Sequence, residues 1–406
     1  MAQFPQTALY IGDLRALGER DRGILDAAGI SLAQARGAQV VDAQYAKVLL
    51  PAPIVVVENP DNSPDPLLLA SLFVQQQIDP ENRRHVIIHG RDGGADKFMA
   101  MVDDFSRRGF IRDDLSALIS VTTTDQEFAA SVKQGLDKIR SGQIKANPMP
   151  PAVSLDGGGA GQDVSRRVAQ LVAGVNRQGA TRMGGHPPDV LVGVMCSAQT
   201  NDPRDLESSR RLAQLIQQAF LESGVKGGLI FGASNVGKMK AISDEAVRLG
   251  MPVYGVETKE LVALPSPGRK AAEQFDVEGA KKLDYLAIHP NIFSRMREIW
   301  EKNAYVFIDT GGVGTVQELM VYTTLNRAFP DQAKPIVVIN ENGHFDKTLA
   351  WLSEAGTAPG RDFQVAESKE EAVAGFKGFL LERKMAKSAK AEDEEEEDYV
   401  PNFGLS

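Results

Sequence analysis

Residues 304–322 read AYVFIDTGGVGTVQELMVY, a stretch that joins a strand, a glycine-rich turn and a helix. The apolar and β-branched residues at its start predict a buried strand that ends at Asp309. Gly311, Gly312 and Gly314 then let the backbone approach a ligand closely, and the helix after them presents free N–H groups and a positive dipole end. This arrangement is typical of a phosphate-binding loop, and a tight turn without a ligand is the alternative.

Thr315 and Glu318 follow the glycines at the start of a helix expected at residues 316–326. They match a capping box, in which two side chains bond to free N–H groups at a helix N-terminus. An acid at this position also points towards a ligand on the glycine loop. A carboxylate beside a ribose would stabilise an oxocarbenium-like centre or orient water. The sequence alone does not separate the capping role from the catalytic one.

The glycine loop belongs to a longer α/β pattern over residues 189–384. Short apolar strands alternate there with amphipathic helices, which predicts a doubly wound, Rossmann-like parallel sheet. Ligands of such sheets bind beyond the carboxyl ends of the strands. The expected strands read VLVGVMC, GGLIFG, MPVYGV, AYVFID, KPIVVIN and DFQVAE, and the expected helices cover residues 205–223, 238–249, 292–303, 316–326, 347–354 and 369–382.

A second, smaller α/β domain is predicted at residues 1–140, where it would regulate the chain or support oligomerisation. PIVVVE, HVIIHG and LSALISVTTT each hold a buried parallel strand, and residues 96–109 and 125–139 read as helices. The two α/β blocks share a weak echo. VIIHGRDGGADKFMAMVDDFSRRG and IVVINENGHFDKTLAWLSEAG each run from a strand through a glycine turn to a helix that begins with Asp-Lys. Common ancestry and chance likeness both remain open.

The segments outside these blocks carry less regular patterns. Residues 141–188 are the expected linker, since they are rich in proline and glycine and contain one short helix, at 164–178. Residues 385–406 are charged and of low complexity, so an acidic disordered tail is expected there.

Composition argues against several classes of protein. The 406-residue chain has a net charge of −9, of which residues 392–398 supply seven negative charges, so the body is nearly neutral and a nucleic-acid partner is not expected. The sequence shows neither an apolar run of the ~18–20 residues that cross a bilayer nor a signal peptide, so no membrane partner is expected. The single cysteine, Cys196, allows no internal disulfide and fits a reducing cytoplasm. The five histidines and Cys196 show no metal-ligand spacing.

Two further loops follow strands of the same predicted sheet. One contains Ser197, after VLVGVM, and the other runs from Gly232 to Gly237, after LIF, with Ser234 and Asn235 inside it. Because the carboxyl ends of parallel strands meet at one edge, these residues are candidates for binding a nucleotide.

The second loop imitates a Walker A motif without completing it. Gly232, Gly237 and Lys238 match the pattern, but its last position must be Ser or Thr to hold magnesium and is Met239 here. This excludes an ATPase of that type. Lys238 then either helps to hold a phosphate or, as we slightly favour, is a solvated helix residue.

Arg295 lies on the helix expected at residues 292–303. The apolar stripe of this helix consists of Ile292, Phe293, Met296, Ile299 and Trp300. Arg295 falls at the edge of the stripe, where an arginine commonly snorkels, and periodicity alone favours a structural role.

Several of these motifs together resemble the Lonely Guy (LOG) family. LOG proteins are nucleoside 5′-monophosphate phosphoribohydrolases, once misannotated as lysine decarboxylases. NIFSRMREIWEKNAYVFIDTGGVGTVQE resembles the family signature, an arginine on a helix, then a strand and P-G-G-x-G-T-x-x-E. VGVMCSAQTN resembles the first strand with its C-G-S-S loop, LIFGASNVGKM the G-G-G-x-x-G-x-M loop, and KPIVVINENGHFDKTLAWL the elements after the signature. The likeness covers residues 189–384.

The resemblance implies hydrolysis of the N-glycosidic bond of an AMP-like nucleotide to free base and ribose 5-phosphate, without a metal or other cofactor. Arg295 and Glu318 match the catalytic pair of the family. The residues that match its phosphate-holding loop are Gly311, Gly312, Gly314 and Thr315. A homodimer or larger homo-oligomer is also implied.

The chain departs from the family pattern at several positions. Thr310, preceded by Asp309, replaces the proline, and the other departures are Met296, Gln317, Ala233 and Ser234. An acid beside an anion cradle is unfavourable unless it faces away or is paired. The alternative function is binding without turnover on the same scaffold, as a nucleotide sensor or a carrier of a phosphorylated cofactor such as molybdenum cofactor.

Overall fold

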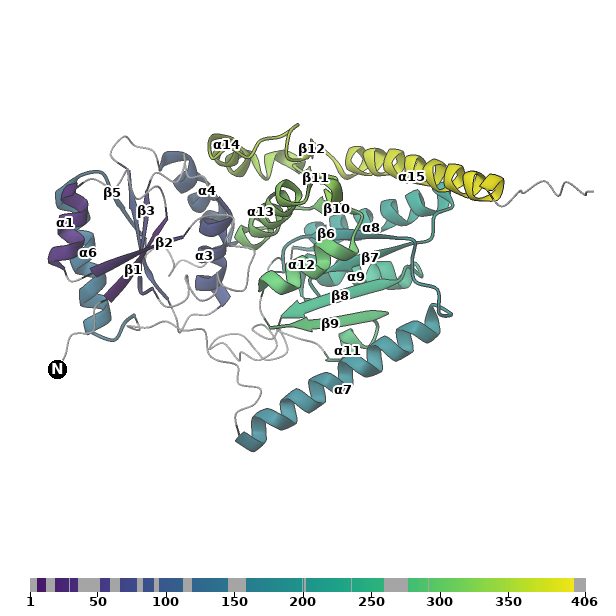
Figure 1. Ribbon diagram of the computed structural model, residues 1–406, viewed down its shortest axis with the longest axis horizontal. Coiled ribbons are helices and arrows are strands. Elements are labelled where there is room, and N and C mark those ends of the chain that lie inside the picture. Colours follow the sequence, from purple (N-terminus) through teal and green to yellow (C-terminus); the bar gives the residue numbers. More distant parts are fainter. Residues whose placement is uncertain are drawn as a thin grey trace, which may run out of the picture.

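The chain forms two parallel β-sheets, each with helices packed on it (Figure 1). The mixed α/β class and the doubly wound parallel sheet predicted from the sequence are confirmed. This computed structural model describes residues 6–11, 19–28, 30–35, 52–58, 66–78, 83–90, 95–111, 119–144, 158–198, 200, 202–234, 236–258, 277–290 and 292–397.

The C-terminal unit contains a seven-stranded sheet in the order β12-β11-β10-β6-β7-β8-β9. Its strands are β6 (Val190–Met195), β7 (Gly227–Phe231), β8 (Val253–Thr258), β9 (Tyr285–His289), β10 (Tyr305–Ile308), β11 (Ile336–Ile339) and β12 (Gln364–Ala366). All the strand pairs are parallel. The chain moves outward from β6 in one direction and then from β10 in the other, so the topological switch point lies between β6 and β10. Open α/β sheets bind their ligands at this point.

Helices cover both faces of this sheet, in two separate apolar clusters. One face carries α8 (Pro203–Ser223), α9 (Gly237–Arg248) and α15 (Lys369–Glu397). The other carries α12 (Ile292–Lys302), α13 (Val313–Ala328) and α14 (Asp346–Glu354). The short helices α11 (Val277–Ala280), η5 (Pro330–Gln332) and η6 (Glu341–Gly343) complete this unit, together with α7 (Gly158–Arg182).

The N-terminal unit contains a five-stranded parallel sheet in the order β2-β1-β3-β4-β5. The strands are β1 (Gln6–Ile11), β2 (Ile30–Ala35), β3 (Ile54–Glu58), β4 (His85–His89) and β5 (Ile119–Thr122). Helices α1 (Glu19–Ala27) and α6 (Asp125–Arg140) pack on one face, around Leu25 and Phe128. Helices α3 (Pro66–Ile78) and α4 (Asp96–Arg107) belong to another cluster.

One continuous apolar cluster joins α3 and α4 to α12, α13 and α14, so the two units share a core (Figure 1). The rings of Phe98 on α4 and Trp351 on α14 lie 5.3 Å apart, edge to face. Within this core, the Gln317 side chain of α13 donates a hydrogen bond to Ser71 Oγ of α3 at 3.0 Å. The N-terminal unit is therefore packed directly on the helix that follows the glycine loop.

Several elements differ from the sequence-based expectation. The strands β1, β2 and β9 were not predicted, and β9 is an edge strand whose side chains are mostly half-buried, which weakens the apolar pattern. The helix predicted at 164–178 is the 25-residue α7, which contacts Leu286 of β9 through Asn176 and pairs through Arg182 with Asp284, just before that strand. Helix α15 continues to Glu397, through part of the expected disordered tail, because alanine, lysine and glutamate favour helix.

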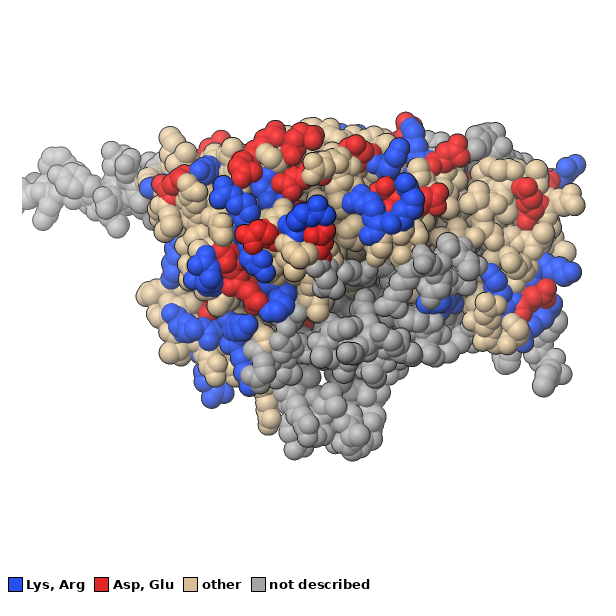
Figure 2. All heavy atoms as spheres, turned by 180° about the vertical axis from the view of Figure 1, so that it is seen from behind, with Lys and Arg blue, Asp and Glu red and all other residues tan. Residues whose placement is uncertain are grey.

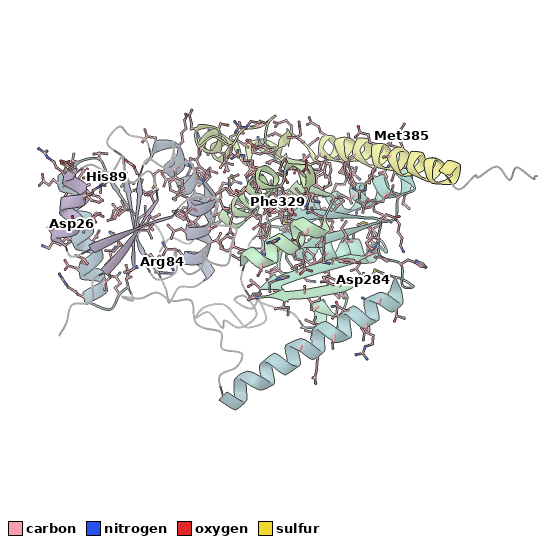
Figure 3. The ribbon with its side chains drawn as sticks, in the orientation of Figure 1. Asp26, Arg84, His89, Asp284, Phe329 and Met385 are labelled. Carbon is pink, nitrogen blue, oxygen red and sulfur yellow. The ribbon has the colours of Figure 1, made fainter. Side chains whose placement is uncertain are left out.

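The surface shows both signs of charge. Figure 2 shows lysine and arginine interspersed with aspartate and glutamate over the described part of one face. None of the helices in the described ranges is long and apolar enough to cross a bilayer. In the N-terminal unit, Arg84 and His89 mark the two ends of β4 (Figure 3).

Candidate active site

The glycine loop connects β10 to α13 at the switch point of the C-terminal sheet. Helix α13 begins at Val313, with Gly312 as its N-cap residue and no side-chain cap. The first N–H groups of a helix have no partner within it, so these groups are available to an anion. The capping box, which the sequence left open as one of two roles, is not formed, because Thr315 lies inside the first turn and Glu318 one turn further on.

The surroundings of the three loop glycines differ. A Cβ atom on Gly311 would lie 2.0 Å from Thr315 Oγ1, so the turn itself requires glycine there. A Cβ atom on Gly312 would lie 2.8 Å from the Cβ of Phe110, a residue of the N-terminal unit. A Cβ atom on Gly314 would meet nothing within 4 Å, so this glycine borders open space. Only Gly314 therefore has no neighbour that explains it, which leaves room there for a ligand.

Arg295 of α12 extends into the interior instead of snorkelling to the surface. Its side chain is buried, with Nε 2.9 Å from the Val256 carbonyl and Nη2 3.2 Å from the Gly232 carbonyl. A Cβ atom on Gly232 would lie 1.8 Å from Nη2, so the glycine of the second loop makes room for this guanidinium. The apolar period of α12 favoured a structural role for Arg295. Such a period, read along one helix, does not show which parts of the chain lie next to that helix in the fold.

Arg295 brings two buried carboxylates together. Its Nη2 is 3.7 Å from Glu318 Oε1, and its Nε is 3.9 Å from Glu257 Oε1 at the end of β8. Burial raises the pKa of Glu318 to about 7, against the opposing effect of Arg295. Burial likewise raises the pKa of Glu257 to about 7, and its Oε2 has no hydrogen-bond partner among the described residues. Glu257 was missed from the sequence, although an acid at the end of an apolar strand was a usable signal.

Replacement of Glu257 by glutamine is expected to stabilise the protein at pH 8 by about 2 kcal/mol and to change little at pH 5. The folded-state pKa of Glu257 lies above its usual value of 4.5, so its ionisation costs stability as the pH rises towards 7. Urea unfolding at both pH values measures the difference. Glu301→Gln, on an exposed ion pair with Arg297, is the control and should have little effect at either pH. A Glu257→Gln variant less stable than the parent at pH 8 contradicts this account.

Comparison with known proteins identifies the family. A family model described as possible lysine decarboxylase matches residues 239–375. A protein of Mycobacterium marinum named cytokinin riboside 5′-monophosphate phosphoribohydrolase is 33% identical over 176 residues, which cover 43% of this chain and 83% of that protein. The chain belongs to the Lonely Guy (LOG) family.

Other relatives of this LOG chain are more distant. The protein of the same name from Mycobacterium tuberculosis is 27% identical over 41% of this chain and 78% of its own length. Among solved structures, the molybdenum cofactor binding protein of Rippkaea orientalis is 22% identical, with 47% of this chain and 97% of that one covered and a TM-score of 0.33.

The acid that departs from the LOG pattern is paired by two lysines. Asp309 is fully buried, with Oδ2 2.6 Å from Lys238 Nζ and Oδ1 3.3 Å from Lys369 Nζ. Burial alone would raise the pKa of Asp309, but these two cations lower it to about 2. Lys238 also donates to the hydroxyl of Thr310. The expectation that Lys238 is a solvated residue is wrong, since it is 1% exposed and neutralises Asp309.

Ala233 and His344 lie in two further loops next to the site of this LOG chain. Ala233 has a φ of 57°, the left-handed conformation that favours glycine. His344, after β11, contacts the backbone of Gly311 through Nε2, with the carbonyl oxygen at 2.8 Å. Burial lowers the pKa of His344 to about 4, so the ring is neutral at pH 7. His344 was missed from the sequence.

The remaining predicted binding residues are distributed around the loop. Ser197 is buried, and its N–H donates to the Thr310 carbonyl at 3.4 Å, which ties its loop to the glycine loop. Gly237 begins α9 with a φ of 58°. Ser234 lines a small hollow together with Asp244. Asn235 lies outside the described residues.

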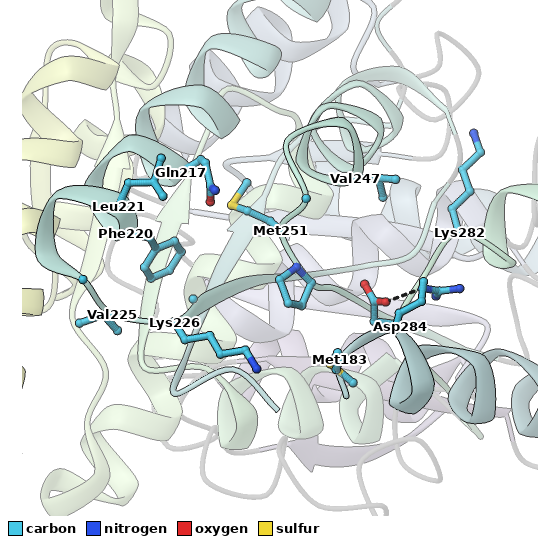
Figure 4. A pocket seen from close by; sticks show the side chains of 15 residues that line it. Met183, Gln217, Phe220, Leu221, Val225, Lys226, Val247, Met251, Lys282 and Asp284 are labelled. Carbon is cyan, nitrogen blue, oxygen red and sulfur yellow. Dashed lines mark hydrogen bonds and ion pairs between the residues drawn. The ribbon is translucent and has the colours of Figure 1, made fainter. Parts of the chain in front are cut away.

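A larger surface hollow lies elsewhere on the C-terminal unit (Figure 4). It is lined by Met183, Phe220, Met251 and Asp284, at the amino ends of β7 and β8. The glycine loop is at the opposite end of the strands, so this hollow is separate from the site. Within the described ranges, no group of three or more His, Cys, Asp and Glu residues is placed to hold a metal ion.

Proposed function

We propose that this chain hydrolyses the N-glycosidic bond of nucleoside 5′-monophosphates such as AMP to the free base and ribose 5-phosphate. The observation that carries the proposal is the buried pair of Arg295 and Glu318 beside a helix N-terminus that suits a phosphate. The names of the two mycobacterial relatives point to the same chemistry. The glycines of the loop would fix the phosphate and so place the ribose near Glu318.

The reaction would need one buried carboxylate near C1′ and one water molecule. As the bond between C1′ and the base nitrogen breaks, positive charge develops at C1′, and ionised Glu318 would stabilise it. Water then adds to C1′, and its proton goes to the departing base. The positive charge of Arg295 favours the ionised form of Glu318. Arg295 is itself held in place by the hydrogen bonds that it donates to the carbonyls of Gly232 and Val256. Burial strengthens these interactions because little water screens them.

Incubation of the purified chain with AMP is the direct test. Chromatography should detect adenine and ribose 5-phosphate in equal amounts, and a screen of the other nucleoside monophosphates would give the base preference. AMP that stays bound and intact over hours would overturn the proposal. That result would instead favour the sensor or cofactor-carrier alternative, in which a buried acid beside the sugar has no evident task.

The rate of AMP hydrolysis is expected to rise with pH through about 7. The reason is that Glu318 must be ionised to stabilise positive charge, and burial raises its pKa to about 7. Glu257 is raised to a similar value, so the two groups titrate as a coupled pair and the profile reports the pair. Values of kcat/KM between pH 5 and 9 give the profile. A rate that falls as the pH rises from 5 to 7 would contradict this role of Glu318.

A further inference from the structure

The two α/β units have the same order of five strands. The order β2-β1-β3-β4-β5 in the N-terminal sheet corresponds to β7-β6-β10-β11-β12 in the C-terminal sheet, and all these strands are parallel. The helices correspond as well. Helices α1 and α6 occupy the places of α8 and α15 in the chain order, while α3 follows β3 as α13 follows β10. Finally, α4 follows β4 as α14 follows β11, and both helices begin with Asp-Lys.

The corresponding helices pack against each other. Helix α3 contacts α13, and α4 contacts α14 (Figure 1). Lys97 at the start of α4 pairs with Glu354 at the end of α14. In the reverse direction, Lys347 at the start of α14 lines a hollow with Asp103 and Arg107 near the end of α4. Such reciprocity is the mark of two copies related by a two-fold axis, as in a symmetric dimer.

The N-terminal unit lacks the features that make the candidate site. Between β3 and α3, residues 59–65 read NPDNSPD, without a glycine. Helix α3 reads PLLLASLFVQQQI, without an acid at the place of Glu318. The described sheet of this unit also has no counterparts of β8 and β9, which border Arg295 and Glu257. The glycine cradle and the Arg295–Glu318 pair therefore occur once in the described chain.

The segment after α4 reaches from the N-terminal unit to the glycine loop. Phe110 lies so close to Gly312 that a Cβ atom there would be 2.8 Å away, and its ring is 5.6 Å from that of His344. Arg108 donates to the His344 carbonyl at 3.0 Å and to ring Nδ1. Nε2 of the same ring lies 2.8 Å from the Gly311 carbonyl oxygen and 3.0 Å from the Gly311 backbone nitrogen. A chain of contacts thus runs from Arg108 to the loop.

We propose that the N-terminal unit is a degenerate copy of the LOG unit that takes the place of a second subunit within the same chain, and that Arg108 and Phe110 position the glycine loop from there. The common strand order and the reciprocal helix packing carry the first part, and the contacts on Gly311 and Gly312 carry the second. Self-association through α13 and α14 is then excluded, and any homo-oligomer uses another face. Only the effect on turnover rests on the proposed function.

Cross-linking tests whether the partner is in the same chain. In the Lys97→Cys/Glu354→Cys variant, a short bismaleimide should join the two cysteines within one chain, so that the mass stays that of a monomer. The native Cys196 is buried and should not react. A mixture of the two single variants should give no cross-linked dimer. A dimer band from that mixture would show that the N-terminal unit packs on another copy, and would overturn the proposal.

A double-variant cycle tests the contact on the loop without relying on activity. Gly312→Ala should lower the thermal midpoint, because the new Cβ atom meets that of Phe110. Phe110→Gly in the same chain should recover part of the loss, whereas Phe110→Ala, which keeps the Cβ atom, should recover less. Equal losses in the single variant and in the Phe110→Gly double variant would contradict the contact.

Kinetics of AMP hydrolysis test the positioning role. Arg108→Ala should raise KM roughly tenfold with little change in kcat, since a charged hydrogen bond that orders the loop is lost. Arg107→Ala removes a neighbouring, exposed arginine that pairs only with Asp103 and Asp104 in the described contacts, and should leave both constants unchanged. An unchanged KM in Arg108→Ala would overturn the role of Arg108. If the chain does not hydrolyse AMP, the cross-link and the cycle still decide the arrangement.

Discussion

Glu318→Gln is expected to lower the rate of base release from AMP roughly 10³-fold while AMP still binds with similar affinity. Glutamine has nearly the same shape as glutamate but carries no negative charge to stabilise the positive C1′ of the transition state. The loop glycines, which would hold the phosphate in the ground state, are untouched. Single-turnover kinetics give the rate, and calorimetry with AMP gives the dissociation constant.

The control for this variant is Glu301→Gln on α12, where the glutamate forms an exposed pair with Arg297. It makes the same chemical change far from the glycine loop and should keep the full rate. If Glu318→Gln retains more than about a tenth of the parental rate, the carboxylate does not stabilise the transition state as described here. Loss of AMP binding together with the rate would point instead to a role in holding the nucleotide.

Asp309→Asn is expected to destabilise the protein by about 3–5 kcal/mol. The variant leaves the buried ammonium groups of Lys238 and Lys369 without the charge that both of them face. Lys369 keeps Glu341, but among the side-chain contacts of the described residues Lys238 keeps only the neutral hydroxyl of Thr310. Urea unfolding at pH 7, with a check that the denaturant dependence is unchanged, measures the loss.

Asp244→Asn provides a matched control for this substitution. Asp244 also pairs with two lysines, Lys240 and Lys282, but its side chain is 39% exposed. Water screens such pairs, so its loss should cost about 1 kcal/mol or less. Equal effects at the two positions would mean that burial adds nothing to the Asp309 cluster. Our explanation of how this chain tolerates an acid beside an anion cradle would then fail.

Much of the fold could be predicted because local patterns in this chain agree with its tertiary structure. The strand before the glycine loop is entirely buried, so it reads as an uninterrupted apolar run in the sequence. Helix α12 buries each residue of its predicted stripe. By contrast, β9 lies at the edge of the sheet, where half-buried side chains leave little pattern. The end of helix α15 was predicted too early, because the same charged composition is typical of disorder and of exposed helix.

The candidate site was predictable only in part, because its residues come from distant segments. Gly311, Gly312, Glu318 and Arg295 could be named since their spacing matches a known pattern. Glu257 and His344 were missed, since neither belongs to a local motif and each acts through a neighbour from elsewhere in the chain. The position of Glu257 at the end of an apolar strand was the one local signal for it.

The sequence by itself determined the α/β class, the family, and the position of a glycine loop between a buried strand and a helix, because these depend on period and spacing along the chain. The tertiary structure decided what the ambiguous residues do. Glu318 faces Arg295 instead of capping its helix, and Lys238 neutralises Asp309 instead of facing water. The structure also showed that one of the three glycines is required by Phe110, from the other unit. The reason is that charge pairing and close packing depend on distances through space, which residue spacing does not encode.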